Sequence, residues 1–215
     1  MEYLGDPKLG IAICRNKLPK KLEIPQRLEK LAKVKNFHPY YGWKEALVGH
    51  QQKMPEYRDC WDFKVGESLA NMAKGTEYDD LYKVYNQVGS EIKQCVTEYC
   101  GPYNITMKYM ESINFVKYEK NQHFHYHADH GFSYVCTVSS IAYLNDDYEG
   151  GELSFHTLDL KYKPSSGDII VFPSTFIYAH AALPVTKGVK YSAVTMFDYN
   201  DDFHKHHAAN YSKTK

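Results

Sequence analysis

A run of short, strand-like segments fills the second half of this 215-residue sequence, and it constrains the fold more than any other feature. Between Asn104 and Tyr199 the apolar stretches are brief, and most are followed by Gly, Asn, Asp or Ser, the residues that form turns. About eight strands in roughly a hundred residues predict a barrel or a double-sheet jelly roll. The expected strands cover residues 104–110, 112–118, 133–144, 151–156, 158–163, 168–173, 177–183 and 190–199.

The first hundred residues show helical periodicity instead. Apolar side chains recur at steps of three and four from Leu81 to Tyr99, which predicts a long helix with one apolar face. Asp79 and Asp80 suit its N-terminus, and Gly101-Pro102 ends it. A shorter apolar face begins just after Pro25, a residue that is favoured in a first helical turn. Helices of this kind must pack against another element, and the strands that follow provide one.

The fold class predicted from these patterns is α+β with a mainly β core. We expect a double-stranded β-helix, or jelly roll, that is buttressed by N-terminal helices. The whole of residues 1–215 is expected to form a single domain, because no repeat and no Pro/Gly/Ser-rich linker divides the chain. Within that domain, residues 1–102 are expected to be the helical support, residues 103–199 the jelly-roll core, and residues 200–215 a polar C-terminal tail.

Composition excludes several classes of protein. The 26 Lys and Arg residues balance 26 Asp and Glu, which argues against binding nucleic acid through bulk charge. No segment approaches the ~20 apolar residues of a membrane span, and the N-terminus lacks the pattern of a secretory signal. The five Cys residues form no CxxC pair, which disfavours zinc knuckles and disulfide frameworks. We therefore expect a cytoplasmic protein that does not bind membranes.

The segment YEKNQHFHYHADHG, residues 118–131, contains four His and one Asp. Alternate residues of a strand point to the same face, about 7 Å apart, so His127 and Asp129 could converge on one metal ion. Adding His125 would stretch the set over about 13 Å, and His123 and His130 are placed worse still. A third ligand is expected from elsewhere in the fold.

Two histidines compete for the third ligand position: His180 in IYAHAALPVTKGVKYS, and His156 directly after GGELSF. Two His and one carboxylate leave coordination positions open, which is the arrangement of non-haem Fe(II) oxygenases. A two-residue HxD pattern is by itself weak, because such a pair on a strand more often serves packing or lies at the surface. The residues alone leave both histidines open.

Three ordered blocks strengthen the interpretation. Tyr118 lies nine residues before His127, YLNDDYEGGELSF spans residues 143–155, and HAALPVTKGVKYS spans residues 180–192. In these blocks the chain resembles the 2-oxoglutarate/Fe(II)-dependent oxygenases over about residues 103–199. Ala181-Ala182 before Leu183-Pro184-Val185, with Lys190 where many relatives carry Arg, is most similar to the prolyl 4-hydroxylases.

The resemblance implies an enzyme that hydroxylates prolyl residues of a peptide or protein and releases succinate and CO2. It implies Fe(II), 2-oxoglutarate and O2 at the site, with ascorbate as a reductant that such enzymes can use. The implied iron ligands are His127, Asp129 and His180. The implied 2-oxoglutarate contacts are Lys190 for the distal carboxylate, with hydroxyl groups from Tyr143 and from Tyr118 or Ser192. A buried carboxylate needs such cationic and hydroxyl partners to offset its desolvation.

Several alternatives remain open. The same core could act on another side chain, a free amino acid or a nucleobase, or it could be a non-catalytic jelly-roll binding module. The extra aromatics and histidines of residues 120–134 could be packing neighbours or a mouth that grips an extended peptide. Arg58, Asp59 and Trp61 are candidate groove residues, although an ordinary surface turn explains them as well. Asn121 replaces a turn Gly of many relatives, and Gly150-Gly151 is expected to form a tight turn.

Overall fold

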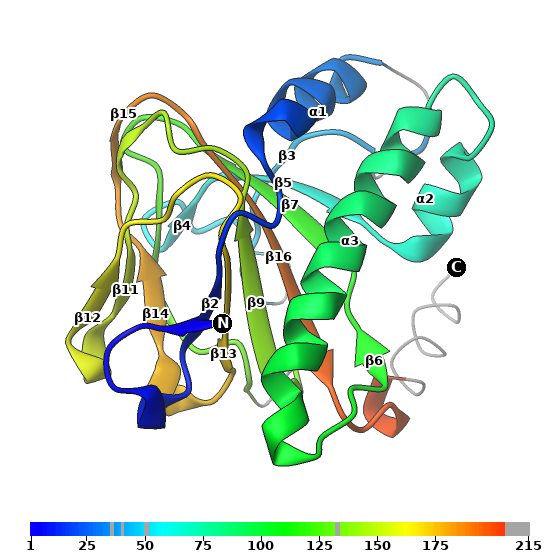
Figure 1. Ribbon diagram of the computed structural model, residues 1–215. Helices are drawn as coiled ribbons and strands as arrows, with labels where there is room; N and C mark the ends of the chain where they lie inside the picture. Colours follow the sequence, from blue (N-terminus) through cyan, green and yellow to red (C-terminus); the bar gives the residue numbers. More distant parts are fainter. Residues whose placement is uncertain (35–36, 40, 50–51, 132–133, 205–215) are drawn as a thin grey trace.

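The computed structural model describes residues 1–34, 37–39, 41–49, 52–131 and 134–204. Two antiparallel sheets pack face to face, and three helices lie along the outer side of the larger one (Figure 1). These helices are α1 (Ile24–Ala32), α2 (Glu67–Ala73) and α3 (Asp79–Cys100). This arrangement confirms the predicted jelly roll with N-terminal helices.

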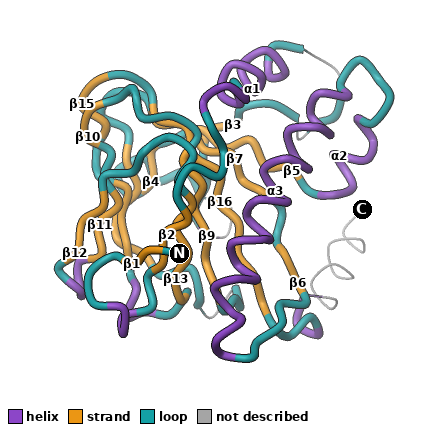
Figure 2. The backbone as a smooth tube through the Cα atoms, viewed as in Figure 1, coloured by secondary structure: helices purple, strands orange, loops and turns teal. Residues whose placement is uncertain are grey.

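The larger sheet has nine strands in the order β1-β2-β13-β9-β16-β7-β5-β3, with β6 paired to β16. It combines strands from both ends of the chain, as the tube in Figure 2 shows. Their bounds are β1 Glu2–Tyr3, β2 Ala12–Cys14, β3 Lys44–Glu45, β5 Trp61–Val65, β6 Tyr109–Met110, β7 Ile113–Tyr118, β9 Val138–Tyr143, β13 Ile169–Pro173 and β16 Lys190–Asp198.

The smaller sheet has five strands in the order β12-β11-β14-β8-β4, and a separate two-stranded sheet pairs β10 with β15. This sheet positions the candidate site, because β8 and β14 lie side by side in it. The bounds are β4 Arg58–Asp59, β8 His123–His127, β10 Glu149–Gly150, β11 Leu153–Phe155, β12 Leu160–Tyr162, β14 His180–Ala182 and β15 Val185–Lys187.

Strand β9 shows how the two apolar layers are built. Its side chains alternate between the two faces of the sheet, as in any strand. Val138 and Ala142 pack into the layer beneath α3, whereas Ile141 and Tyr143 pack into the layer between the sheets. Every residue of β9 is therefore buried. A strand that is covered on both faces has no exposed positions, so its sequence does not alternate between apolar and polar residues.

The predicted long helix is confirmed as α3, and Pro25 lies in the first turn of α1. The expected strands are present but shorter, and residues 104–108 lie outside β6. The segment 177–183 is not one strand, because a 3-10 turn precedes β14. The division at residues 102 and 199 stays a prediction.

The first 102 residues, expected as a helical support, contain strands as well as helices. They also supply β1 to β5, of which β1, β2, β3 and β5 join the larger sheet and β4 the smaller. Several of these strands are two residues long, too short to leave a periodic signal. The segment WDFKV of β5 does alternate, with Phe63 and Val65 fully buried, and that alternation was the available clue.

The two turn predictions hold. Asn121 has φ 70°, the left-handed conformation that Asn tolerates. Gly150 has φ 73°, and a Cβ there would lie 2.4 Å from the carbonyl oxygen of Pro184. Most of the tail expected at residues 200–215 lies outside the described residues. His204 is the exception, since its ring is buried, stacks on Tyr109 and contacts the Asp198 carboxylate. Among the described residues, no helix is long and apolar enough to cross a bilayer.

Candidate active site

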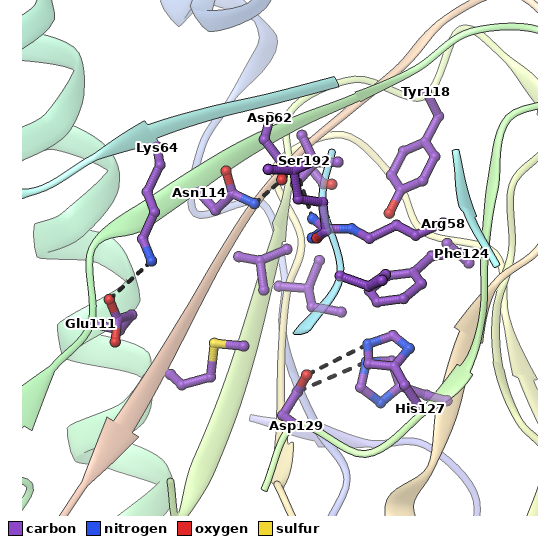
Figure 3. Close-up of a pocket in the computed structure, with 18 of the residues that line it drawn as sticks. Arg58, Asp62, Lys64, Glu111, Asn114, Tyr118, Phe124, His127, Asp129 and Ser192 are labelled. Atoms are coloured by element: carbon purple, nitrogen blue, oxygen red, sulfur yellow. Dashed lines mark hydrogen bonds and ion pairs between the residues drawn. The ribbon is translucent and has the colours of Figure 1, made fainter. Parts of the chain in front are cut away.

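His127, Asp129 and His180 come together where β8 ends and β14 begins. His127 is the last residue of β8, His180 is the first of β14, and the two are paired in register. Asp129 follows in the loop after β8 and faces His127 (Figure 3). Its carboxylate oxygens lie 3.5 Å from His127 Nε2 and 3.9 Å from His180 Nε2. All three donor atoms lie within 4.8 Å of one another.

The surroundings of this triad fit a divalent metal ion. His127 Nδ1 lies 2.8 Å from the His125 carbonyl oxygen, and His180 Nδ1 lies 3.1 Å from that of Tyr178. An imidazole that donates from Nδ1 to a carbonyl keeps the lone pair of Nε2 free for a metal. Ser139 Oγ donates to Asp129 Oδ2 at 2.5 Å and fixes the carboxylate. Two imidazoles and one carboxylate are the donor set that suits non-haem Fe(II).

The charge states suit the same role. Burial lowers the pKa of His180 to about 4, so its imidazole is neutral near pH 7. Burial alone would raise the pKa of the Asp129 carboxyl. The adjacent His180 and His127 and the hydrogen bond from Ser139 outweigh burial and hold that pKa below its ordinary value. Neutral imidazoles and an ionised carboxylate are the forms that ligate a cation.

A cavity of about 760 Å³ connects the triad to a buried lysine. Lys190 begins β16 and is 2% exposed. Its Nζ donates to the Gly151 carbonyl oxygen at 2.8 Å and lies 5.1 and 5.4 Å from the ring centres of Tyr118 and Tyr143. Burial, followed by the nearby Lys163 charge, lowers the pKa of Lys190 to about 7.

Among the described residues, no carboxylate forms an ion pair with this lysine. Lys190 hydrogen-bonds a neutral carbonyl, and the buried hydroxyl of Tyr143 has no hydrogen-bond partner. A carboxylate between them would pair with the ammonium group and accept the hydroxyl hydrogen. The residues therefore fit a dicarboxylate that reaches from the metal triad to Lys190.

The structure brings all the predicted site residues to one cavity, whose walls include Tyr118, Tyr143, His127, Asp129, His180, Lys190 and Ser192. His156, the competitor for the third ligand, lies in a 3-10 turn with its ring 5.2 Å from that of Tyr126, and it does not line this cavity. His125 stacks on Tyr57, and His130 Nδ1 contacts the Cys136 carbonyl oxygen. Their placement supports the choice of His180.

Among the candidate groove residues, Arg58 lines the cavity, whereas Asp59 and Trp61 do not. Asp59 accepts a hydrogen bond from Gln122, and Trp61 donates to Glu119. The sequence reasoning missed Asp62 and Asn114, which line the cavity beside Arg58 (Figure 3). Both occupy strands of the larger sheet at positions where an apolar residue would be ordinary. A polar residue at such a position was the only feature of the sequence that could have pointed to them.

Comparison with known proteins agrees with this geometry. Residues 113–198 match the family model described as the 2OG-Fe(II) oxygenase superfamily. Over these residues the chain is similar to that superfamily. Members of the superfamily are 2-oxoglutarate-dependent dioxygenases, as the metal triad and the buried lysine had suggested.

Two curated relatives are named as hydroxylases. One is a putative prolyl 4-hydroxylase of Acanthamoeba polyphaga mimivirus, 28% identical over 49% of this chain and 52% of that protein. The other is a PKHD-type hydroxylase of Crocosphaera subtropica, 34% identical over 33% of this chain and 36% of that protein. The chain thus matches about half or less of the length of these curated relatives.

Solved structures show the same fold. A prolyl hydroxylase of Trichoplax adhaerens, in complex with a peptide fragment of hypoxia inducible factor, superposes with a TM-score of 0.67 at 16% identity, covering 89% of this chain and 84% of that one. The viral collagen prolyl hydroxylase of Paramecium Bursaria Chlorella virus-1 gives 0.61 at 18% identity, covering 87% and 94%. Both likenesses concern the fold.

Proposed function

We propose that this protein is an Fe(II)- and 2-oxoglutarate-dependent dioxygenase that hydroxylates prolyl residues of a peptide or protein, with succinate and CO2 as co-products. One observation carries the proposal: a metal triad shares a single cavity with a buried lysine that has no carboxylate partner among the described residues. The names of the relatives and of the solved structures support the prolyl substrate.

The metal-binding role belongs to His127, Asp129 and His180. The iron would supply O2 activation and the oxidising power for C–H hydroxylation. Pairing of β8 with β14 sets the separation of the two imidazoles, and the carbonyl contacts at each Nδ1 fix their rotation. Ser139 donates to one oxygen of the Asp129 carboxylate and so orients it. These contacts hold the donor atoms in place before the metal arrives.

The cosubstrate-binding role belongs to Lys190, with Tyr143, Tyr118 and Ser192 as its hydroxyl partners. Lys190 would exchange its bond to the Gly151 carbonyl for the distal carboxylate of 2-oxoglutarate. The added negative charge would restore the ordinary, protonated state of the lysine. The apolar side chains of Ile141, Leu153 and Val194 line the cavity as well and would exclude water from the reacting groups. We include O2 and ascorbate, the latter as a reductant, in the same proposal.

Incubation with Fe(II), 2-oxoglutarate, ascorbate and a set of Pro-containing peptides tests this function. We expect succinate release that depends on the peptide, and mass spectrometry should find one added oxygen on Pro. Asp129→Ala is the matched inactive control, because it removes one proposed ligand. Peptide-independent turnover, with oxidation of a free amino acid or a nucleobase instead, would refute the prolyl substrate. An Asp129→Ala variant as active as the parent would refute the metal assignment.

A further inference from the structure

A polar cluster lines the same cavity outside the proposed metal and cosubstrate positions. It consists of Arg58 in β4, Asp62 in β5 and Asn114 in β7. One carboxylate oxygen, Asp62 Oδ1, accepts from an Arg58 terminal nitrogen at 2.7 Å and from Asn114 Nδ2 at 2.9 Å (Figure 3). The carboxylate therefore holds the arginine and the asparagine next to each other.

Within the described part of the chain, each of the two held side chains has one buried polar atom without a hydrogen-bond partner. In Arg58 it is Nε, a donor, and in Asn114 it is Oδ1, an acceptor. Both terminal nitrogens of Arg58 are used, since one donates to Asp62 and the other to the Leu47 carbonyl oxygen. Buried polar atoms in native proteins are nearly always paired, so a free donor and a free acceptor on two side chains that line the same cavity indicate a missing ligand.

The cluster lies beside the metal triad. The Arg58 guanidinium carbon is 4.7 Å from the centre of the Phe124 ring, and that ring stacks on His127 with 3.6 Å between centres. The guanidinium is thus one aromatic ring away from a proposed iron ligand. Successive Cα atoms of a peptide are about 3.8 Å apart. When one residue of a peptide reacts at the metal, the main chain of its neighbours therefore comes within reach of Arg58.

We propose, on the basis of the proposed function, that Arg58 and Asn114 bind the main chain of the peptide substrate beside the reacting residue. In an extended segment, the N–H and C=O of a residue point to the same side. Arg58 Nε donates to that carbonyl oxygen, and Asn114 Oδ1 accepts from that N–H. Proline has no N–H, so the residue bound here is a neighbour of the reacting proline.

The experiment measures KM for a peptide that the parent hydroxylates, and for versions of it that are N-methylated at one neighbour of the proline at a time. We expect methylation of one neighbour to raise the parent's KM about tenfold, the loss of one buried hydrogen bond. Asn114→Leu should raise KM for the unmodified peptide to a similar extent. In that variant methylation should add little, because the acceptor it would disrupt is already gone.

Asn86→Leu is the matched control, since Asn86 lies on the exposed face of α3. It should leave KM and the methylation penalty at the parent's values. Methylation that never changes the parent's KM would overturn the subsite without any variant having to fold. An equal methylation penalty in Asn114→Leu and the parent would overturn it too. A parent that hydroxylates no prolyl peptide would instead overturn the proposed function, and the subsite with it.

Discussion

The affinity for 2-oxoglutarate should depend on pH through Lys190. The ammonium group is buried against Tyr118 and Tyr143, with Lys163 lowering its pKa further and Glu152 raising it in part. The result is a pKa of about 7 in the free protein. Above that pH the lysine loses the proton with which it would bind a carboxylate. Affinity should therefore fall as pH rises, by about tenfold per pH unit beyond pH 7.

Arginine at the same position is the control. Its pKa stays above about 12, so Lys190→Arg should keep its charge and bind 2-oxoglutarate with nearly constant affinity from about pH 6 to pH 9. The metal triad is identical in the two proteins, so the ratio of their dissociation constants isolates the lysine. Calorimetry under anaerobic, Fe(II)-saturated conditions measures both constants, and buffers of different ionisation enthalpy report the proton taken up. A ratio independent of pH would refute the assignment of Lys190.

Three further predictions concern metal binding and stability. Ser139→Ala removes the hydrogen bond to Asp129 and should weaken Co(II) binding by about 10- to 100-fold, as measured by absorption titration; unchanged affinity would show that the serine does not orient the carboxylate. Gly150→Ala should lower the free energy of unfolding in urea by more than Gly75→Ala, because both have left-handed φ but only at Gly150 does a Cβ meet backbone atoms. Equal losses would mean that the turn relaxes freely. Leu81→Ala should cost about 2–5 kcal/mol in the same assay, since this side chain on the inner face of α3 is fully buried; a loss below about 1 kcal/mol would show that the layer collapses around the gap.

The elements with long periodic signals could be predicted from the sequence. Helix α3 keeps its apolar stripe over its whole length, so its existence and both ends followed from the spacing and from Gly101-Pro102. The jelly roll followed from the density of turns between short strands. Strands β1, β3 and β4 could not be predicted, because a segment of two residues carries no period. Their positions depend on the tertiary fold.

Most of the polar wall of the cavity was also beyond prediction, since only Arg58 was a candidate groove residue. Arg58, Asp62 and Asn114 come from three strands. Only in the folded protein do Arg58 and Asn114 meet at one oxygen of the Asp62 carboxylate. Read singly, each is an ordinary polar residue in a short strand. Pairing of β5 with β7 places Asp62 opposite Val116, next to the position of Asn114, and no local pattern encodes that register.

The pairing of His127 with Asp129 was predicted by a geometric argument that needs one change, whereas His180 was implied by the family resemblance. Along a continuous strand, the Cα atoms of His127 and Asp129 would lie about 7 Å apart on one face. At that separation the two side chains would have to lean toward each other before their donor atoms could meet. In the structure β8 ends at His127, and the chain bends so that Asp129 approaches from the following loop, with its carboxylate 3.5 Å from the His127 imidazole. The HxD spacing works because it spans the end of a strand. A substitution that extended β8 past residue 127 would separate these ligands even if all three side chains were kept.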